Sequence, residues 1–180
     1  MTTSEYPSRP TSAPAPITLE VTAKWLSNQT RLNPSLKIVD VCSNQSTRQT
    51  AFLPGALRLD WEQAFATGPH LKPSPLVFAA TMSQLGVGDD DTIVLYDEGE
   101  GRRAFSVLRW LRGFGHRKVF VLVGGRTGWL TQGYSLVREP TRFSPSSFTV
   151  CIEGTFCSSS PTGAAETAST HGRRRSRRAA

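Results

Sequence analysis

The chain has 180 residues, a formal net charge of +7 and 38% hydrophobic residues, and it includes four tryptophans. This length suits one domain with a hydrophobic core and is too short for two domains of ordinary size. The sequence has no run of roughly 20 apolar residues, which argues against a membrane-spanning helix. Residues 1–16 are rich in Ser, Thr and Pro and lack the apolar core of a secretory signal. We predict a cytoplasmic protein without membrane association, with a disordered lead-in over residues 1–16.

The three cysteines, Cys42, Cys151 and Cys157, are an odd number and show no Cys-x-x-Cys spacing. This pattern indicates neither a disulfide framework nor a zinc site. The acidic run Asp89–Asp91 is typical of a solvated turn and does not predict a metal site either. We therefore expect a reducing environment, no metal and no cofactor.

The first half of the chain alternates helical and extended patterns. Thr22 has the side chain of an N-cap and precedes a short helix. Compact apolar runs predict strands at 36–41 and 57–59. Ser74 then caps a helix that has proline at its first position, and Gly86 ends this helix.

The second half contains the most informative stretch of the sequence. The apolar, β-branched run 92–96 predicts a buried parallel strand. A polar loop follows and leads into a helix with one apolar face, formed by Ala104, Val107, Leu108 and Leu111. Another buried strand is predicted at 118–123, and a short helix around Trp129. Because strands alternate with helices, we predict an α/β fold in which helices cover both faces of a parallel sheet.

The loop after the strand at 92–96 is the candidate site, because open α/β sheets place their sites at the carboxyl ends of their strands. Its residues are Asp97, Glu98, Gly99, Glu100, Gly101 and Arg102. Three of these six residues are acidic and one is basic. The residue at position 97 therefore largely decides what chemistry the loop can perform.

The composition changes near Phe148. Residues 149–180 show neither strand nor helix periodicity and are rich in Ser, Thr, Ala and Gly, so we predict a disordered tail. The segment Arg173–Arg178 contains five arginines, which leaves a net charge of only +2 for the rest of the chain. Such a run suits nonspecific contact with nucleic acid. Because it lacks interleaved aromatic residues for base recognition, we keep nucleic-acid binding only as an alternative.

Cys42 and Arg48 match the Cys-x5-Arg spacing of cysteine phosphatases, directly after a predicted strand. In that chemistry the thiolate is the nucleophile and the arginine holds the phosphate. The five intervening residues include no glycine that would let the backbone curl around an anion. The turn at Pro54-Gly55 also leaves little room for the helix whose N-terminus should bind the phosphate. We interpret this segment as a surface loop with an incidental cysteine.

A series of short motifs follows in a fixed order along residues 19–148: Leu53-Pro54-Gly55-Ala56, Pro73-Ser74-Pro75, Leu85-Gly86-Val87, Ile93-Val94-Leu95-Tyr96-Asp97, Arg112-Gly113-Phe114-Gly115-His116, Leu122-Val123-Gly124-Gly125 and Trp129. This ordered set resembles the rhodanese family. It is most similar to the first domain of tandem thiosulfate and 3-mercaptopyruvate sulfurtransferases. The resemblance implies the rhodanese-like fold, a five-stranded parallel sheet flanked by helices on both faces, with the domain at residues 17–148.

In the rhodanese family, a cysteine at the end of the central strand accepts sulfane sulfur as a persulfide. The N–H groups of the following loop point at this sulfur, which favours its anionic form. The resemblance places Asp97 at the position of that cysteine. A carboxylate cannot form a persulfide, and its charge repels an anionic donor such as thiosulfate. The resemblance therefore implies a domain without sulfur transfer of its own.

Three hypotheses on function follow. The one we favour is a catalytically inactive, truncated first half of a tandem sulfurtransferase, which docks on a catalytic rhodanese domain or associates with itself. In this hypothesis the tail replaces the lost second domain through an out-of-frame read. The second hypothesis is an active sulfurtransferase that uses Cys42, the only cysteine of the predicted domain. The third is a binding protein that acts through the basic tail at Arg173–Arg178.

Overall fold

A computed structural model describes residues 19–42, 51–65, 72–152 and 155–159. Five strands form one sheet in the order β1-β5-β4-β2-β3, and all neighbouring strands are parallel. The predicted α/β class and five-stranded parallel sheet are thus confirmed. The strands of this sheet are β1 (Glu20–Val21), β2 (Leu36–Cys42), β3 (Ala56–Asp60), β4 (Thr92–Tyr96) and β5 (Val119–Leu122). The helices are α1 (Ala23–Leu32), α2 (Trp61–Phe65), α3 (Pro75–Gln84), α4 (Arg102–Gly113) and α5 (Gly125–Thr131).

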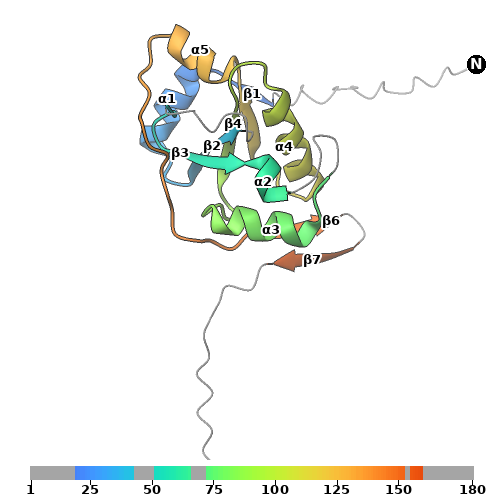
Figure 1. The fold of residues 1–180 in the computed structure, drawn as a ribbon. Coiled ribbons are helices and arrows are strands. Elements are labelled where there is room, and N and C mark those ends of the chain that lie inside the picture. Colours follow the sequence, from blue (N-terminus) through green and yellow to red (C-terminus); the bar gives the residue numbers. More distant parts are fainter. Residues whose placement is uncertain (1–18, 43–50, 66–71, 153–154, 160–180) are drawn as a thin grey trace, which may run out of the picture.

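Helices cover both faces of the sheet (Figure 1). Successive residues of a strand point to opposite faces, and the central strand β4 is apolar on both. Ile93 and Leu95 join the buried cluster that includes α2, α3 and α4. Val94 and Tyr96 join a second cluster that includes α1 and α5. The continuous apolar run of β4 is therefore explained by burial from two sides.

The predicted helix caps at Thr22 and Ser74 are both present. The Thr22 hydroxyl accepts a hydrogen bond from the Trp25 N–H at 3.2 Å, and the Ser74 hydroxyl accepts one from the Val77 N–H at 3.4 Å. Each side chain satisfies a donor that the first helical turn cannot pair internally. The helices therefore begin where the sequence predicts.

The structure differs from the sequence prediction just after Phe148. Residues predicted as the start of a disordered tail, 149–180, include two paired antiparallel strands, β6 (Thr149–Ile152) and β7 (Thr155–Ser159). The physical reason is tertiary, since Phe148 and Val150 are buried against the α3 and α4 side of the core. In addition, Cys151 is disulfide-bonded, which the spacing of the cysteines did not indicate.

Several predictions concern residues outside the described part of the chain. These are the lead-in over residues 1–16, the loop that contains Arg48, and the tail from residue 160 to the end, which includes Arg173–Arg178. Within the described ranges, no helix has the length and apolar character needed to cross a membrane.

Candidate functional site

A cavity of about 930 Å³ opens at the carboxyl ends of β3, β4 and β5. Its walls come from the start of α2, the loop between β4 and α4, the first turns of α4, and α5. The lining residues are Trp61, Glu62, Asp97, Glu98, Gly99, Glu100, Arg102, Arg103, Ser106, Gly124, Thr127, Gly128 and Thr131. The cavity therefore lies where the topology of an open α/β sheet predicts a site.

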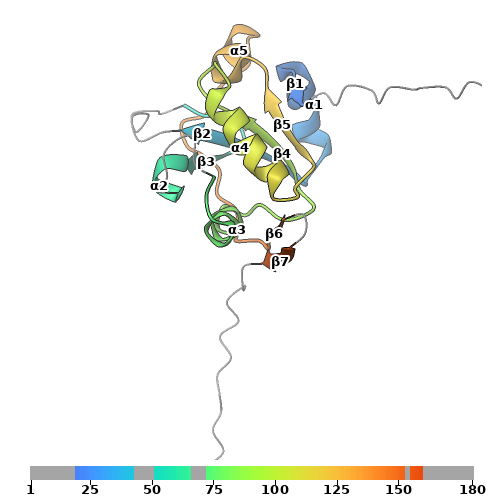
Figure 2. The ribbon, with the colours of Figure 1, turned by 90° about the vertical axis from the view of Figure 1, so that its right-hand side faces the viewer.

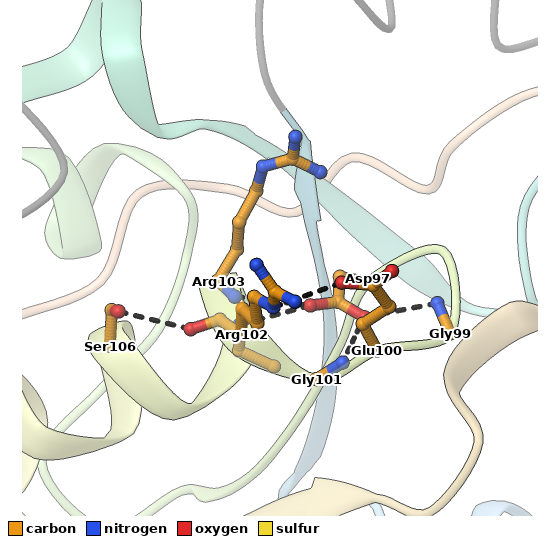
Figure 3. Close-up of polar contacts among 8 residues, drawn as sticks. Asp97, Gly99, Glu100, Gly101, Arg102, Arg103 and Ser106 are labelled. Atoms are coloured by element: carbon orange, nitrogen blue, oxygen red, sulfur yellow. Dashed lines mark hydrogen bonds and ion pairs between the residues drawn. The ribbon is translucent and has the colours of Figure 1, made fainter.

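Asp97 lies at the base of this cavity and is only 4% exposed. Its Oδ1 accepts hydrogen bonds from the N–H groups of Gly99 at 3.1 Å and Gly101 at 2.8 Å. Its Oδ2 accepts from Arg103 at 3.1 Å and Ala104 at 3.5 Å (Figure 3). We call these four N–H groups the amide cradle. The cradle thus encloses a carboxylate that belongs to the chain itself.

The sequence of the loop explains the cradle. Gly101 adopts a left-handed conformation with φ of +75°, which only glycine reaches without strain, and it precedes α4 without a side chain of its own to cap the helix. Asp97 fulfils that capping role from a distance, because its Oδ2 accepts from N–H groups in the first turn of α4. A negative charge at a helix N-terminus is also favoured by the helix dipole.

The start of α5 fixes the other side of the loop. The N–H of Arg126 donates to the Asp97 carbonyl at 2.9 Å, and the N–H of Thr127 donates to the Glu98 carbonyl at 3.1 Å. The Arg126 guanidinium also pairs with the Glu98 carboxylate and donates to the carbonyl of Ala51. The loop is therefore held on both sides by backbone and side-chain contacts.

The mouth of the cavity contains charges of both signs. Glu100 and Arg102 form an ion pair at 3.0 Å, and their side chains are 76% and 85% exposed. Arg103 is half-buried and points away from the Asp97 carboxylate (Figure 3), and its guanidinium has no partner among the described residues. Trp61 is buried in the wall, and its indole N–H likewise has no hydrogen-bond acceptor within the described part of the chain.

Cys42, the alternative nucleophile, is not among the residues that line the cavity. It is buried at the end of β2, where its Sγ donates to the Leu59 carbonyl at 3.4 Å and accepts from Arg58 Nε at 3.3 Å. Burial raises the pKa of the Cys42 thiol, although the hydrogen bond from Arg58 opposes this effect. A thiol with a raised pKa and no access to solvent is a poor nucleophile.

His116 is buried against Phe148, with the two ring centroids 5.6 Å apart. Burial lowers the pKa of this imidazole, so the ring is a neutral part of the core. His116 is not among the residues that line the cavity at Asp97. Within the described ranges, no three His, Cys, Asp or Glu side chains are grouped so that they could hold a metal ion.

Comparison with known proteins agrees with this geometry. The sequence-family model of the rhodanese-like domain matches residues 22–132 of this chain. The chain belongs to the rhodanese-like family. The thiosulfate sulfurtransferase of Cricetulus griseus is 34% identical over 149 residues, a match that covers 74% of this chain and 50% of that protein. The 3-mercaptopyruvate sulfurtransferase of Escherichia coli is 35% identical over 121 residues, covering 61% of this chain and 43% of the relative.

The fold comparison agrees with the sequence comparison. The crystal structure of the Escherichia coli 3-mercaptopyruvate enzyme superposes with a TM-score of 0.66 at 29% identity, covering 75% of this chain and 56% of that one. The rhodanese-like fold predicted from the motifs is thereby confirmed. The chain spans about half the length of the relatives that it matches.

The structure places the loop predicted from the sequence at this cavity. Five of the six predicted loop residues line the cavity, and the sixth, Gly101, contributes its N–H to the amide cradle. Sequence reasoning missed the walls formed by α2 and α5, which contribute Trp61, Glu62, Thr127 and Thr131. These residues follow the carboxyl ends of β3 and β5, so the rule that located Asp97 could also have located them.

Proposed function

We propose that this chain is a rhodanese-like domain without sulfur transfer of its own, of the kind found as the first half of tandem thiosulfate or 3-mercaptopyruvate sulfurtransferases. The observation that carries the proposal is the Asp97 carboxylate in the amide cradle. Sulfur transfer in this family needs a thiolate there, because the sulfane atom becomes bonded to the thiolate sulfur as a persulfide. A carboxylate has no sulfur atom and cannot form this bond.

The geometry supports the proposal in two further ways. The four N–H groups of the cradle already donate to Asp97. A sulfur-donor anion such as thiosulfate would therefore have to displace the Asp97 carboxylate, which is part of the chain itself. In addition, the thirteen described residues that line the cavity include no cysteine that could act from another position. Both points argue against turnover at this site.

The alternative, sulfur transfer through Cys42, requires the thiol to meet a donor from a buried position. Cys42 is 2% exposed, and Arg58 and Leu59 occupy its polar contacts. The stretch that follows it in the sequence lies outside the described residues. We keep this alternative as an arm of the experiment.

The test is the formation of thiocyanate from thiosulfate and cyanide by the purified chain. We expect no turnover above the uncatalysed rate for the natural sequence or for Cys42→Ser. We expect measurable turnover for Asp97→Cys, whose thiolate can accept from the same N–H groups in place of the carboxylate. Mass spectrometry should detect one added sulfur atom on Asp97→Cys and none on the natural chain. Turnover by the natural chain that Cys42→Ser abolishes would contradict the proposal and establish the alternative.

For the partner, we propose a catalytic rhodanese domain that covers the rim of the cavity. Leu130 lies in α5 with the lining residues Thr127 and Thr131, and Val123 lies just before α5. The side chains of Val123 and Leu130 are 49% and 50% exposed. Exposed apolar side chains at a cavity rim suit a protein interface. Self-association through the same rim is the second candidate. Light scattering distinguishes it from binding to a catalytic domain: a chain that is monomeric alone and forms a heterodimer with a separately added catalytic rhodanese domain supports the proposed partner.

The cytoplasmic setting also remains a proposal. It requires that the disulfide at Cys151 be dispensable for folding, because disulfides rarely persist in a reducing compartment. Unfolding curves recorded with and without a thiol reductant test this requirement. A domain that unfolds on reduction alone would argue for an oxidising compartment.

A further inference from the structure

The outer face of α4 is strongly basic. This helix contains four arginines, Arg102, Arg103, Arg109 and Arg112, and no Asp or Glu. Figure 2 shows α4 crossing the front of the molecule, with the sheet behind it. Because the opposite side of the helix is buried in the core, the charged side chains are left on the side that faces solvent.

The helical spacing places three of these arginines on one stripe. Arg109 is seven residues after Arg102, and Arg112 is three residues further, so all three lie within about a third of the helix circumference. Phe105 is partly exposed and lies between Arg102 and Arg109 on the same stripe. We call Arg102, Phe105, Arg109 and Arg112 the arginine stripe.

The charges of the arginine stripe are poorly compensated within the domain. Arg109 is exposed and Arg112 is half-buried, and neither has an ionic or hydrogen-bond partner among the described residues. Among the described residues Arg102 pairs only with Glu100, in a contact where both side chains are largely exposed. Such surface pairs contribute little and exchange easily for others. The stripe can therefore accept external carboxylates or phosphates without breaking a stable internal pair.

Acidic residues bound the arginine stripe at its Arg102 end. Glu62 and Glu100 lie at the cavity mouth beside Arg102. At the Arg112 end, the segment that follows α4 contains charges of both signs, because Asp89 and Asp90 lie near Arg117 and Lys118. The arginine stripe itself extends for about 15 Å, because ten residues of helix separate Arg102 from Arg112.

We propose that the arginine stripe binds an acidic α-helix of a partner protein, about three turns long. The length of the stripe and its apolar centre at Phe105 match such a helix, whose carboxylates would recur at the same three- and seven-residue intervals. A nucleic-acid duplex is a longer rod of phosphates, and it would run onto the carboxylates of Glu62 and Glu100 at the Arg102 end of the stripe. This proposal is independent of whether the site at Asp97 transfers sulfur.

The probe is an alanine-based helical peptide with glutamates at positions i, i+3 and i+10. These positions match Arg112, Arg109 and Arg102 when the peptide helix runs antiparallel to α4. A second peptide of the same composition has its glutamates spread around the helix. A short DNA duplex is the third probe. The full-length chain is used with the arginines of 173–178 replaced by serine, so that the tail cannot bind the acidic probes. Affinity is measured at low and moderate salt.

We expect the matched peptide to bind more tightly than the rearranged one, and added salt to weaken its binding. Arg109→Ala combined with Arg112→Ala should weaken the binding about fivefold, as expected for two surface ion pairs. Because alanine is the best helix former, these changes should preserve α4, and circular dichroism checks this. Arg31→Ala, which removes an exposed arginine from the last turn of α1, is the matched control and should leave the affinity unchanged.

Three results would overturn the proposal. The first is failure of the matched peptide to bind at low salt. The second is an affinity that neither the double substitution nor the rearrangement of the glutamates changes. The third is tighter binding of the DNA duplex than of the matched peptide, which would assign the stripe to nucleic acid instead.

Discussion

Replacing Asp97 with alanine tests whether the loop between β4 and α4 depends on its own carboxylate. The substitution removes the acceptor for four backbone N–H groups and leaves the chain otherwise intact. The Gly101 and Ala104 groups lie in buried surroundings, whereas those of Gly99 and Arg103 are partly exposed and can rehydrate. The cost should therefore be concentrated in the two buried donors.

The magnitude follows from the geometry. Three of the four bonds are 3.1 Å or shorter, and a hydrogen bond to a charged group contributes about 1.5–3 kcal/mol, with less where water can replace it. We expect Asp97→Ala to lower the free energy of unfolding by about 3–4 kcal/mol. Asp97→Asn should cost less, about 2 kcal/mol, because the amide oxygen can still accept from one pair of N–H groups while its NH₂ faces the other pair.

Urea unfolding followed by tryptophan fluorescence measures this change, and an unchanged m-value would show that the denatured state is unaffected. Asp90→Ala is the matched control, because Asp90 is exposed and its side chain accepts no hydrogen bond from the described residues. It should change the stability by less than about 0.5 kcal/mol. A loss below about 1 kcal/mol for Asp97→Ala would refute the reasoning, because it would mean that the cradle is not held closed by the carboxylate.

Three further predictions concern residues that support the site. Tyr96→Phe removes the hydroxyl that accepts from the Leu53 N–H at 3.2 Å and should cost about 1–2 kcal/mol in urea unfolding; no change would show that this donor finds another partner. Gly125→Ala should destabilise by at least about 1 kcal/mol, because φ is +53° there and a Cβ would collide with the Asp97 carbonyl; an equally stable variant would contradict the close approach. Burial lowers the pKa of His116 below 6.5, so the unfolded chain binds a proton more readily, and the free energy of unfolding should fall as the pH drops below about 6.5. His116→Gln should show a shallower fall over that range, and an identical pH dependence would exclude His116 as a cause.

The sheet and its helices were predictable because local signals agree with the tertiary structure. The strand at 92–96 is a continuous apolar run, and Thr22 and Ser74 cap helices where the sequence places them. Helix α2 was not predicted, because five residues are too few to show helical periodicity. The strands after Phe148 were also missed. The residue that leads into them is held by a distant group, since the Ser83 hydroxyl accepts from the Phe148 N–H at 3.1 Å.

The candidate site was likewise predictable only in part from the sequence. The acidic residue at 97 and its place after β4 could be identified from the chain alone. The inward turn of its carboxylate, onto N–H groups as far ahead as Ala104, also depends on the contacts between the loop and the start of α5, which the residue pattern does not show. Likewise, sequence spacing could place Arg109 and Arg112 on one helix face, but only the packed structure shows that they lack internal partners.

The carboxylate at the base of the cavity also affects how ligands for this protein should be sought. A loop that binds an anion from solution is usually loosened when that anion is withdrawn, and such loops respond to added anions with a higher melting temperature. Here the anion is part of the polypeptide and cannot be dialysed away. Thermal-shift screens with thiosulfate or other small anions should therefore give no signal from this loop, whereas compounds that reach Trp61 and Arg103 at the cavity wall should still register.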